Sequence, residues 1–246
     1  MKILTLNLRH NQDRWEERFP LVVEVLEKHQ PDIIGFQEVW RPIQQADRIL
    51  DQVAADGWNL KVLAKQGKYG REGIAIASRY PISSHESIDL PGNERVAQRA
   101  LLEVNGTQLW IANTHLHHQP KDESVRLPQM QALLRWLADT DPPTILTGDM
   151  NATPESVTIR EAKQIYSSAH EAVHGTEPAV TSPTPLAPDY RSGQGSTIDY
   201  IFYSGDKVRV TAASVVANEP HPEDETLYPS DHFGILASIE LEGIVR

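Results

Sequence analysis

The sequence predicts an α/β protein in which two packed β-sheets are flanked by helices. Strand-like apolar segments recur along the whole chain, whereas only a few segments show helical periodicity. The C-terminal third contains several strands with almost no helix between them. A regular alternation of strand and helix would not give this distribution, so two stacked sheets are the favoured architecture.

Nine segments have the alternating or continuous apolar pattern that is typical of strands. In chain order they are KILTLNL (2–8), DIIGFQEV (32–39), GIAIAS (73–78), RALLEV (99–104), QLWIANTHL (108–116), TILTGDM (144–150), TIDYIFYS (197–204), VRVTAASVV (208–216) and FGILASIEL (233–241).

Helical periodicity predicts helices over residues 20–29, 43–55 and 124–138, and Pro154 suits the first turn of a further short helix. Residues 175–196 and 218–230 are rich in Pro, Ser, Thr and Gly or in charged residues, which predicts long loops. Strands stand on both sides of each loop and no internal repeat is found, so we expect a single domain over residues 1–246.

The composition limits the chemistry of the protein. Its 246 residues include no cysteine, which excludes disulfides, thiol catalysis and cysteine-based zinc sites. The formal net charge of −11 argues against long duplex DNA as the substrate, although clustered carboxylates that face a cation would contribute to it. No apolar run is long enough to cross a membrane, and the N-terminus enters a strand without a signal-peptide pattern, so we expect a cytoplasmic protein.

Alternation places one carboxylate in the interior. Residues two apart on a strand share a face, so Glu38 follows Ile34 and Phe36 toward the same side. A buried carboxylate without a partner is costly, and we therefore expect Glu38 to be paired, hydrogen-bonded or bound to a metal ion.

Other polar residues occupy similar positions at strand ends. They stand at the C-terminal ends of two strands (Asn113, His115, Asp149, Asn151) and at the N-terminal starts of two others (Asp199, Asp231, His232). Such ends meet at one edge of a sheet if the strands are antiparallel. Each residue taken alone also fits an ordinary role, such as a turn, a helix cap or a solvated rim residue. Only their coincidence indicates a site.

The expected site has four carboxylates, two amides and two imidazoles: Glu38, Asp149, Asp199, Asp231, Asn7, Asn151, His115 and His232. Four carboxylates close together need a cation, a shared proton or paired histidines. Oxygen donors without cysteine favour Mg²⁺ or Mn²⁺ over structural zinc. A calcium-binding β-sandwich is an alternative, but the Asp-x-Asp spacing of its loops is not found.

Seven segments together resemble the endonuclease/exonuclease/phosphatase superfamily, in that family's order: LTLNLRH, DIIGFQEVW, EGIAIASRYPI, NTHLH, TGDMN, TIDYIFYS and SDHFGI. They extend over nearly the whole chain. The resemblance implies a four-layer α-β-β-α sandwich of the DNase I type, with two central mixed and mostly antiparallel sheets.

The same resemblance implies roles for individual residues. Asn7 and Glu38 are expected to bind the divalent metal, completed or supported by Asp231. Asp149 and Asn151 match the pair that handles the nucleophile, the leaving group and the phosphate oxygens, and His115 is expected to stabilise developing charge. Asp199 and His232 resemble the family's Asp-His pair, in which the carboxylate orients the ring. Arg99 aligns with a phosphate-binding arginine of some members, although a surface strand cation is an equally good interpretation.

The function implied is hydrolysis of a phosphate ester with Mg²⁺ or Mn²⁺ as cofactor. We expect a phosphodiesterase that acts on a small phosphodiester or a single-stranded nucleic-acid end, with a nucleotide or nucleic acid as its partner. The alternatives are a DNA endonuclease, a sphingomyelinase-like lipid phosphodiesterase, a phosphomonoesterase and an inactive binding module. Either Asp149 or His232 is expected to be the general base.

Overall fold

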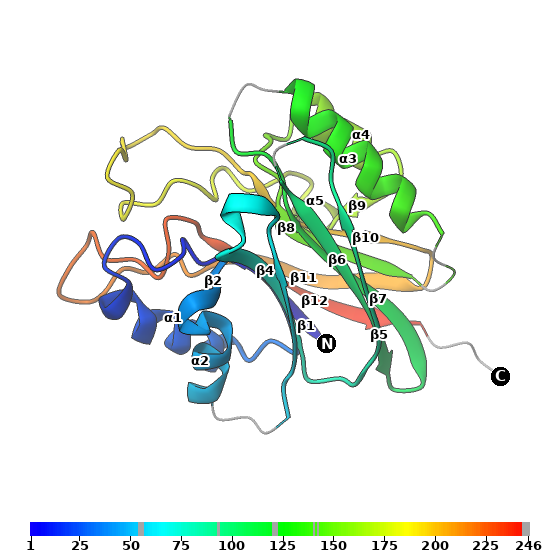
Figure 1. The fold of residues 1–246 in the computed structure, drawn as a ribbon, viewed down its shortest axis with the longest axis horizontal. Helices are drawn as coiled ribbons and strands as arrows, with labels where there is room; N and C mark the ends of the chain where they lie inside the picture. The colour runs from blue at the N-terminus through cyan, green and yellow to red at the C-terminus, as the bar shows by residue number, and fades with distance from the viewer. Residues whose placement is uncertain (54–56, 93, 120–122, 140, 142, 243–246) are drawn as a thin grey trace.

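Two six-stranded sheets face each other in the computed structural model, which describes residues 1–53, 57–92, 94–119, 123–139, 141 and 143–242. The strand order is β11-β12-β1-β2-β4-β3 in one sheet and β5-β6-β7-β8-β10-β9 in the other. In Figure 1, α1 and α2 lie on one side of the paired sheets and α3 and α4 on the opposite side. The predicted four-layer sandwich is therefore confirmed.

The helices and strands have the following bounds. The first sheet contains β1 (Lys2–Asn7), β2 (Ile33–Trp40), β3 (Asn59–Ala64), β4 (Glu72–Ser78), β11 (Val208–Val216) and β12 (Gly234–Leu241). The second contains β5 (Ile82–Asp89), β6 (Val96–Val104), β7 (Thr107–His115), β8 (Thr144–Asp149), β9 (Ser167–Ser168) and β10 (Asp199–Ser204). The helices are α1 (Trp15–His29), α2 (Gln45–Gln52), α3 (Glu123–Leu137), α4 (Val157–Ala162) and α5 (Ala169–His174), with short 3-10 turns at Arg41–Ile43 and Gly67–Tyr69.

Alternation along the strands builds three apolar layers. On β1, Leu4 and Leu6 pack with α1 and α2, whereas Ile3 joins the cluster between the two sheets. On β8, Ile145 joins that same inter-sheet cluster and Leu146 packs toward α3 and α4. Both sheets are covered on both faces, which explains why so many of their strands read as nearly continuous apolar runs.

The nine predicted strands are all present, as are the helices near 20–29, 43–55 and 124–138 and the short helix after Pro154. Residue 55, where the second predicted helix ends, lies outside the described residues. The sequence pattern missed β3, β5, β9 and α5. β3 and β5 are edge strands without a fully buried residue, so their sequences lack the apolar pattern that burial imposes.

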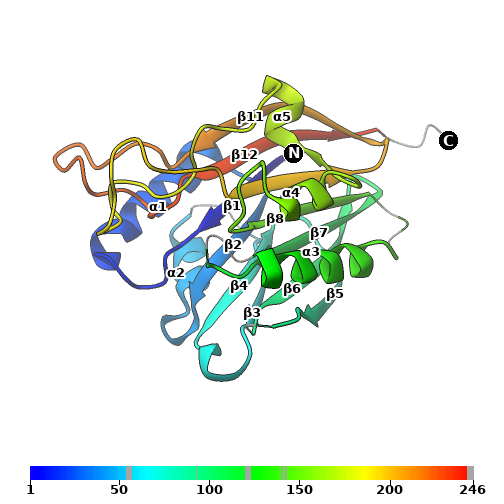
Figure 2. The same cartoon turned by 90° about the horizontal axis from the view of Figure 1, so that it is seen from above.

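Two long segments without regular helices or strands, 175–196 and 218–230, lie at the same end of the sandwich in both views (Figures 1 and 2). No helix within the described residues is long and apolar enough to cross a membrane.

A β-bulge gives Glu38 a position that simple alternation does not predict. The register of β2 against β4 shifts between Phe36 and Val39, and Glu38 has a positive φ of 52°. Phe36 and Val39 both pack in the helix-side cluster, although they are an odd number of residues apart. The prediction that Glu38 shares a face with Ile34 and Phe36 is therefore wrong, because the extra residue turns Glu38 toward the second sheet.

A buried polar layer joins the sheets beneath this position. Asn113 donates hydrogen bonds from Nδ2 to the carbonyls of Phe36 (2.8 Å) and Ala75 (2.9 Å) in the opposite sheet. Its Oδ1 accepts from Gln37 Nε2 at 2.7 Å and from Thr147 Oγ1 at 3.2 Å. Asn113 thus holds the sheets in register and is not one of the groups that face the site.

This layer requires a glycine at position 35. A Cβ on Gly35 would lie 2.1 Å from Thr147 Oγ1 and 3.0 Å from Asn113 Oδ1. We expect Gly35→Ala to lower the free energy of unfolding by about 1–3 kcal/mol, the usual cost of overpacking a core. Chemical denaturation would measure the loss. A Gly35 variant as stable as the wild type would contradict this account of the layer.

Candidate active site

Strand pairing brings the predicted polar ends together. In the antiparallel pair β8–β10, Asp149 lies opposite Asp199, and in the parallel pair β7–β8, His115 lies beside Asp149. These residues border a pocket of about 780 Å³ at the mouth between the sheets. Its walls include the predicted residues Glu38, His115, Asp149, Asn151 and His232.

Asp149 lies at the centre of the contacts. Its Oδ2 accepts a hydrogen bond from Asn7 Nδ2 at 3.0 Å and lies 3.4 Å from His115 Nε2 and 3.9 Å from His232 Nε2. Its Oδ1 accepts from the backbone N–H of Asn151 at 2.9 Å, an Asx-type turn that ends the strand. Asn151 has a positive φ of 50°, which such a turn tolerates, and its side chain donates to the Leu116 carbonyl at 3.2 Å. Asp149 and Asn151, at the C-terminal end of the apolar strand β8, therefore form the centre of the site.

Asp199 and His232 form a buried pair. His232 Nδ1 lies 2.9 Å from Asp199 Oδ2, which also accepts from Thr181 Oγ1 at 2.6 Å. With Nδ1 held in this way, Nε2 of His232 faces Asp149 and the pocket. The pair matches the arrangement in which a carboxylate fixes the orientation of an imidazole.

Glu38 lies beside a second group of charges that the sequence pattern did not reveal. His10 Nε2 is 3.4 Å from Glu38 and 2.9 Å from Glu72. Lys65 forms a close ion pair with Glu72, and its Nζ lies 3.4 Å from His115 Nδ1. Glu38 thus has His10 on one side and His115 on the other. Its Oε1 lies 3.9 Å from His115 Nε2, the atom that also faces Asp149.

Asn7 and Asp231 do not line the pocket but contact residues that do. Asn7 Oδ1 accepts from the Arg9 backbone N–H at 2.9 Å while its Nδ2 holds Asp149. Asp231 lies 3.2 Å from Arg9 Nη1. The buried Arg18 joins these two segments, because its Nη1 donates to the carbonyls of Leu8 (3.2 Å) and Pro229 (2.8 Å).

Burial and neighbouring charges shift the pKa values of the site residues in different directions. Burial and the nearby Asp199 raise the pKa of Asp149 to about 7. Burial works against a charge on His232, but Asp199 and the neighbouring carboxylates outweigh it and raise the pKa of this ring well above its usual value. Burial together with Arg95 and Lys65 lowers the pKa of His115 well below its usual value. For Glu38, burial opposes ionisation, yet His10 and Lys65 prevail and its pKa is lowered. One imidazole is therefore charged and the other neutral at neutral pH.

Two sets of side chains could hold a cation: Glu38, His115 and Asp149 in one, and Asp149, Asp199 and His232 in the other. In each set the ligand atoms lie within 4.8 Å of one another. Within the part of the chain that the structure describes, His115 Nε2 and Asp199 Oδ1 are buried and have no hydrogen-bond partner, as expected where an ion or substrate supplies it. Carboxylate oxygens around Glu38 and Asp149 suit a hard divalent ion, so the residues present fit the expected cofactor class.

Arg99 does not belong to this site. Its guanidinium donates to Glu86 (Nη2–Oε2 2.6 Å) and to the Trp136 carbonyl (2.9 Å). It also stacks between the rings of Trp110 and Trp136. These contacts use it in packing on the outer side of β6, and it is absent from the pocket walls. The expected phosphate-binding role does not fit this position.

Several pocket residues were not among the predictions: Arg9, His10, Lys65, Glu72, Arg95 and His118. Arg9 and His10 stand two and three residues after Asn7, the last residue of β1, so their position just past a strand end was a usable signal. Lys65 follows β3 and Arg95 precedes β6, both in segments without a distinctive pattern, whereas Glu72 is the first residue of β4 and begins the EGIAIASRYPI segment. Only the fold brings these three residues to the pocket.

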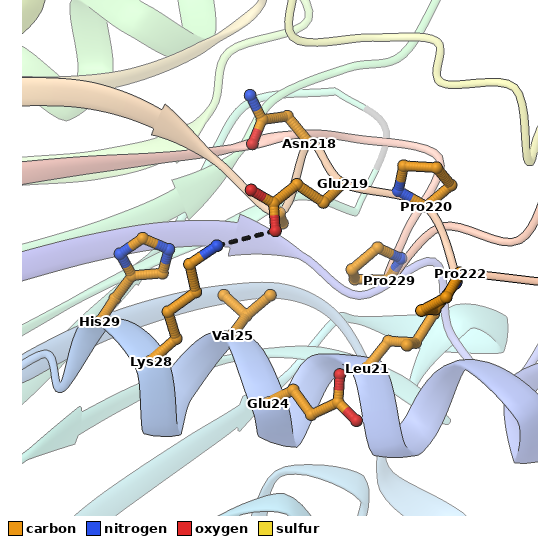
Figure 3. A pocket seen from close by; sticks show the side chains of 11 residues that line it. Leu21, Glu24, Val25, Lys28, His29, Asn218, Glu219, Pro220, Pro222 and Pro229 are labelled. Atoms are coloured by element: carbon orange, nitrogen blue, oxygen red, sulfur yellow. Dashed lines mark hydrogen bonds and ion pairs between the residues drawn. The ribbon is translucent and has the colours of Figure 1, made fainter. Parts of the chain in front are cut away.

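A smaller cavity of about 150 Å³ lies between α1 and residues 217–229 (Figure 3). Lys28 and Glu219, paired at 2.7 Å, span its edge, and Leu21, Val25 and Pro229 line its apolar part. It contains neither cation-binding set, so the larger pocket is the candidate active site.

Comparison with known proteins identifies the family of the chain. The family model described as "Endonuclease/Exonuclease/phosphatase family" matches residues 4–232. Nocturnin of Rattus norvegicus is 27% identical over 248 residues, covering 91% of this chain and 58% of the relative, and Nocturnin of Xenopus laevis is 28% identical over 255 residues, covering 91% and 64%. The chain thus spans less than two thirds of the length of these relatives.

Solved structures give the same result for the fold. The human Nocturnin catalytic domain has a TM-score of 0.80 at 24% identity, with 98% of this chain and 93% of that chain covered. A mannosyl-6-phosphatase of Bacteroides thetaiotaomicron has a TM-score of 0.78 at 19% identity, with 97% and 99% covered. The family match extends across both sheets and includes every strand end that contributes to the pocket, and the chain accordingly belongs to the endonuclease/exonuclease/phosphatase family.

Proposed function

We propose that this protein is a divalent-metal-dependent hydrolase of phosphate esters, and more narrowly a phosphodiesterase. The observation that carries the proposal is the convergence of Asp149, His115 and the Asp199–His232 pair on one pocket, beside Glu38. The human relative 2′,5′-phosphodiesterase 12, 24% identical over 277 residues, supports a diester as the substrate.

In this proposal Glu38 is the principal metal ligand and Asp149 lies opposite it. A bound Mg²⁺ or Mn²⁺ would polarise the phosphoryl group and stabilise the leaving oxygen. Asn7 holds Asp149 through its Nδ2, and Asp231 supports the site through Arg9. Asn7, which was expected to bind the metal directly, thus takes a supporting role, and of the two roles expected for Asp231, completing or supporting the metal site, the second is proposed.

The chain's own residues supply the remaining steps. Asp149 Oδ2 and His232 Nε2, 3.9 Å apart, move the protons between the attacking water and the substrate oxygens. Asp199 keeps His232 in the required orientation, as its contact at Nδ1 implies. Asn151 and His115 hydrogen-bond the phosphoryl oxygens from the β8 and β7 ends of the pocket.

One activity screen tests this proposal. Bis-p-nitrophenyl phosphate, p-nitrophenyl phosphate, short RNA and DNA, dinucleotides and sphingomyelin would each be assayed with Mg²⁺, with Mn²⁺ and with EDTA. Metal-dependent hydrolysis of the diesters, faster than that of the monoester, is expected. No hydrolysis of any of them would favour a binding module.

Substrate size is a separate prediction. A pocket of about 780 Å³ takes one or two nucleotide-sized units, and the net charge of −11 repels long polyanions. Tyr69 borders the pocket and is 47% exposed, so it can stack on a base, whereas Tyr228 packs against Phe233. We therefore expect small diesters or single-stranded ends to be preferred over internal sites in duplex DNA.

Competition between supercoiled plasmid, a short oligonucleotide and a small diester at two salt concentrations would measure this preference. Efficient plasmid nicking that weakens steeply with added salt would reveal many phosphate contacts and would reverse the prediction.

A further inference from the structure

Arg95 is a buried cation of the pocket that forms no ion pair with any of the described carboxylates. It precedes β6, is 7% exposed and lines the pocket. Its contacts are a long hydrogen bond from Nη1 to the His115 carbonyl (3.4 Å) and one from Nη2 to His118 Nδ1 (3.3 Å). Within the described residues, no carboxylate lies at ion-pair distance from it.

Other buried cations among the described residues contact carboxylates or several backbone carbonyls. Lys65, also in the pocket, is paired with Glu72. Arg99 is paired with Glu86, and Arg18 donates to four backbone carbonyls, two of them on Leu8 and Pro229. A buried guanidinium has five N–H donors and is costly without an acceptor. Arg95 therefore has donors available for an anion that enters the pocket.

The position of Arg95 in the sheet places an anion bound to it away from the reacting phosphate. The N–H of Leu116 donates to the Asp149 carbonyl on β8, at 3.0 Å. Adjacent residues of a strand direct their backbone groups to opposite edges, so the carbonyl of His115, which Arg95 contacts, faces away from β8. β6 is the second strand from β8 in the sheet order, so the backbones of these two strands lie about 10 Å apart.

The reacting phosphate already has its own ligands around Asp149. We propose that Arg95, with His118 beside it, forms a second anion subsite that binds another phosphate group of the same substrate. This inference rests on the proposed function and narrows it to substrates that bear a phosphate in addition to the ester that is hydrolysed. The exposed His118 and Gln119 leave this subsite open to solvent.

Three nucleotides with the same base and sugar test the subsite: adenosine 3′,5′-bisphosphate, adenosine 5′-monophosphate and adenosine 3′-monophosphate. Calorimetric titration with Mg²⁺ would give their affinities for the wild type, Arg95→Gln and Arg99→Gln. A charge-assisted contact to the second phosphate is expected to give the bisphosphate about a 10- to 100-fold advantage over either monophosphate. Arg95→Gln should remove this advantage. Arg99→Gln, which removes a buried guanidinium from β6 outside the pocket, should keep it.

Arg95→Lys keeps the charge without the fork and is expected to keep part of the advantage, so the test remains available if Arg95→Gln does not fold. Equal affinities of the wild type for all three nucleotides would overturn the subsite. So would equal weakening of all three in Arg95→Gln together with slower hydrolysis of bis-p-nitrophenyl phosphate, because Arg95 would then bind the reacting phosphate. Failure of the wild type to hydrolyse any ester would instead remove the proposed function, while the titrations would still measure the subsite.

Discussion

Replacing Asp149 with Asn will lower kcat on bis-p-nitrophenyl phosphate by about 10²- to 10⁴-fold, the range that general acid-base catalysis commonly contributes. The amide keeps the shape of the side chain but can neither accept a proton nor carry the negative charge that faces His115 and His232. His232→Ala, the other member of the proton-transferring pair, should have an effect of the same order. Steady-state kinetics at saturating Mg²⁺ would measure both.

Asp51→Asn is the matched control, since Asp51 is exposed on α2 and is not one of the residues that line the pocket. Circular dichroism and thermal unfolding should show that the Asp149 and His232 variants keep the fold. Turnover within tenfold of the wild type in either variant would exclude that residue from the chemical step.

Removal of divalent ions will abolish hydrolysis, and Mg²⁺ or Mn²⁺ will restore it. The carboxylates gathered around Glu38 and Asp149 repel one another, and buried atoms such as His115 Nε2 are left without partners. Glu38→Gln removes the principal proposed ligand charge, so we expect the metal concentration for half-maximal activity to rise at least about tenfold, as it does when supporting ligands are lost. Metal titrations of activity would measure the shift.

Glu27→Gln, on the exposed face of α1, should leave the metal titration unchanged. Elemental analysis of the purified protein before and after EDTA treatment would identify the bound ion. Full activity in excess EDTA, with no metal detected, would be incompatible with the proposed chemistry.

The candidate site was predictable to the extent that it depends on strand ends. Asp149 ends a buried strand, Asn151 follows it and Asp199 begins another strand, so their meeting requires only that β8 and β10 pair antiparallel. Arg99 shows the limit of the same reasoning. Its place on a strand was read correctly, but the neighbours that engage it, Trp110, Trp136 and Glu86, come from other elements.

Glu38 illustrates a different limit. Strict alternation directed it to the face of Ile34 and Phe36, and a single extra residue in β2 reversed that result. A bulge depends on how β2 pairs with β4, and no local signal within the strand marks it. Arg95 and Lys65 are similar cases, since their flanking sequence is ordinary and their roles arise from the pocket they border.

The sequence by itself predicted the two packed sheets, their outer helices and most of the strands, because burial of both sheets imposes apolar patterns that are local and visible in the sequence. The family was predicted from the resemblance of seven segments. Only the tertiary structure decided which polar groups line one pocket, how the bulge directs Glu38, and that Arg95 forms no ion pair with a carboxylate of the described residues. These features depend on contacts between residues far apart in the chain, and electrostatic interactions are set by the distances and burial that the fold creates.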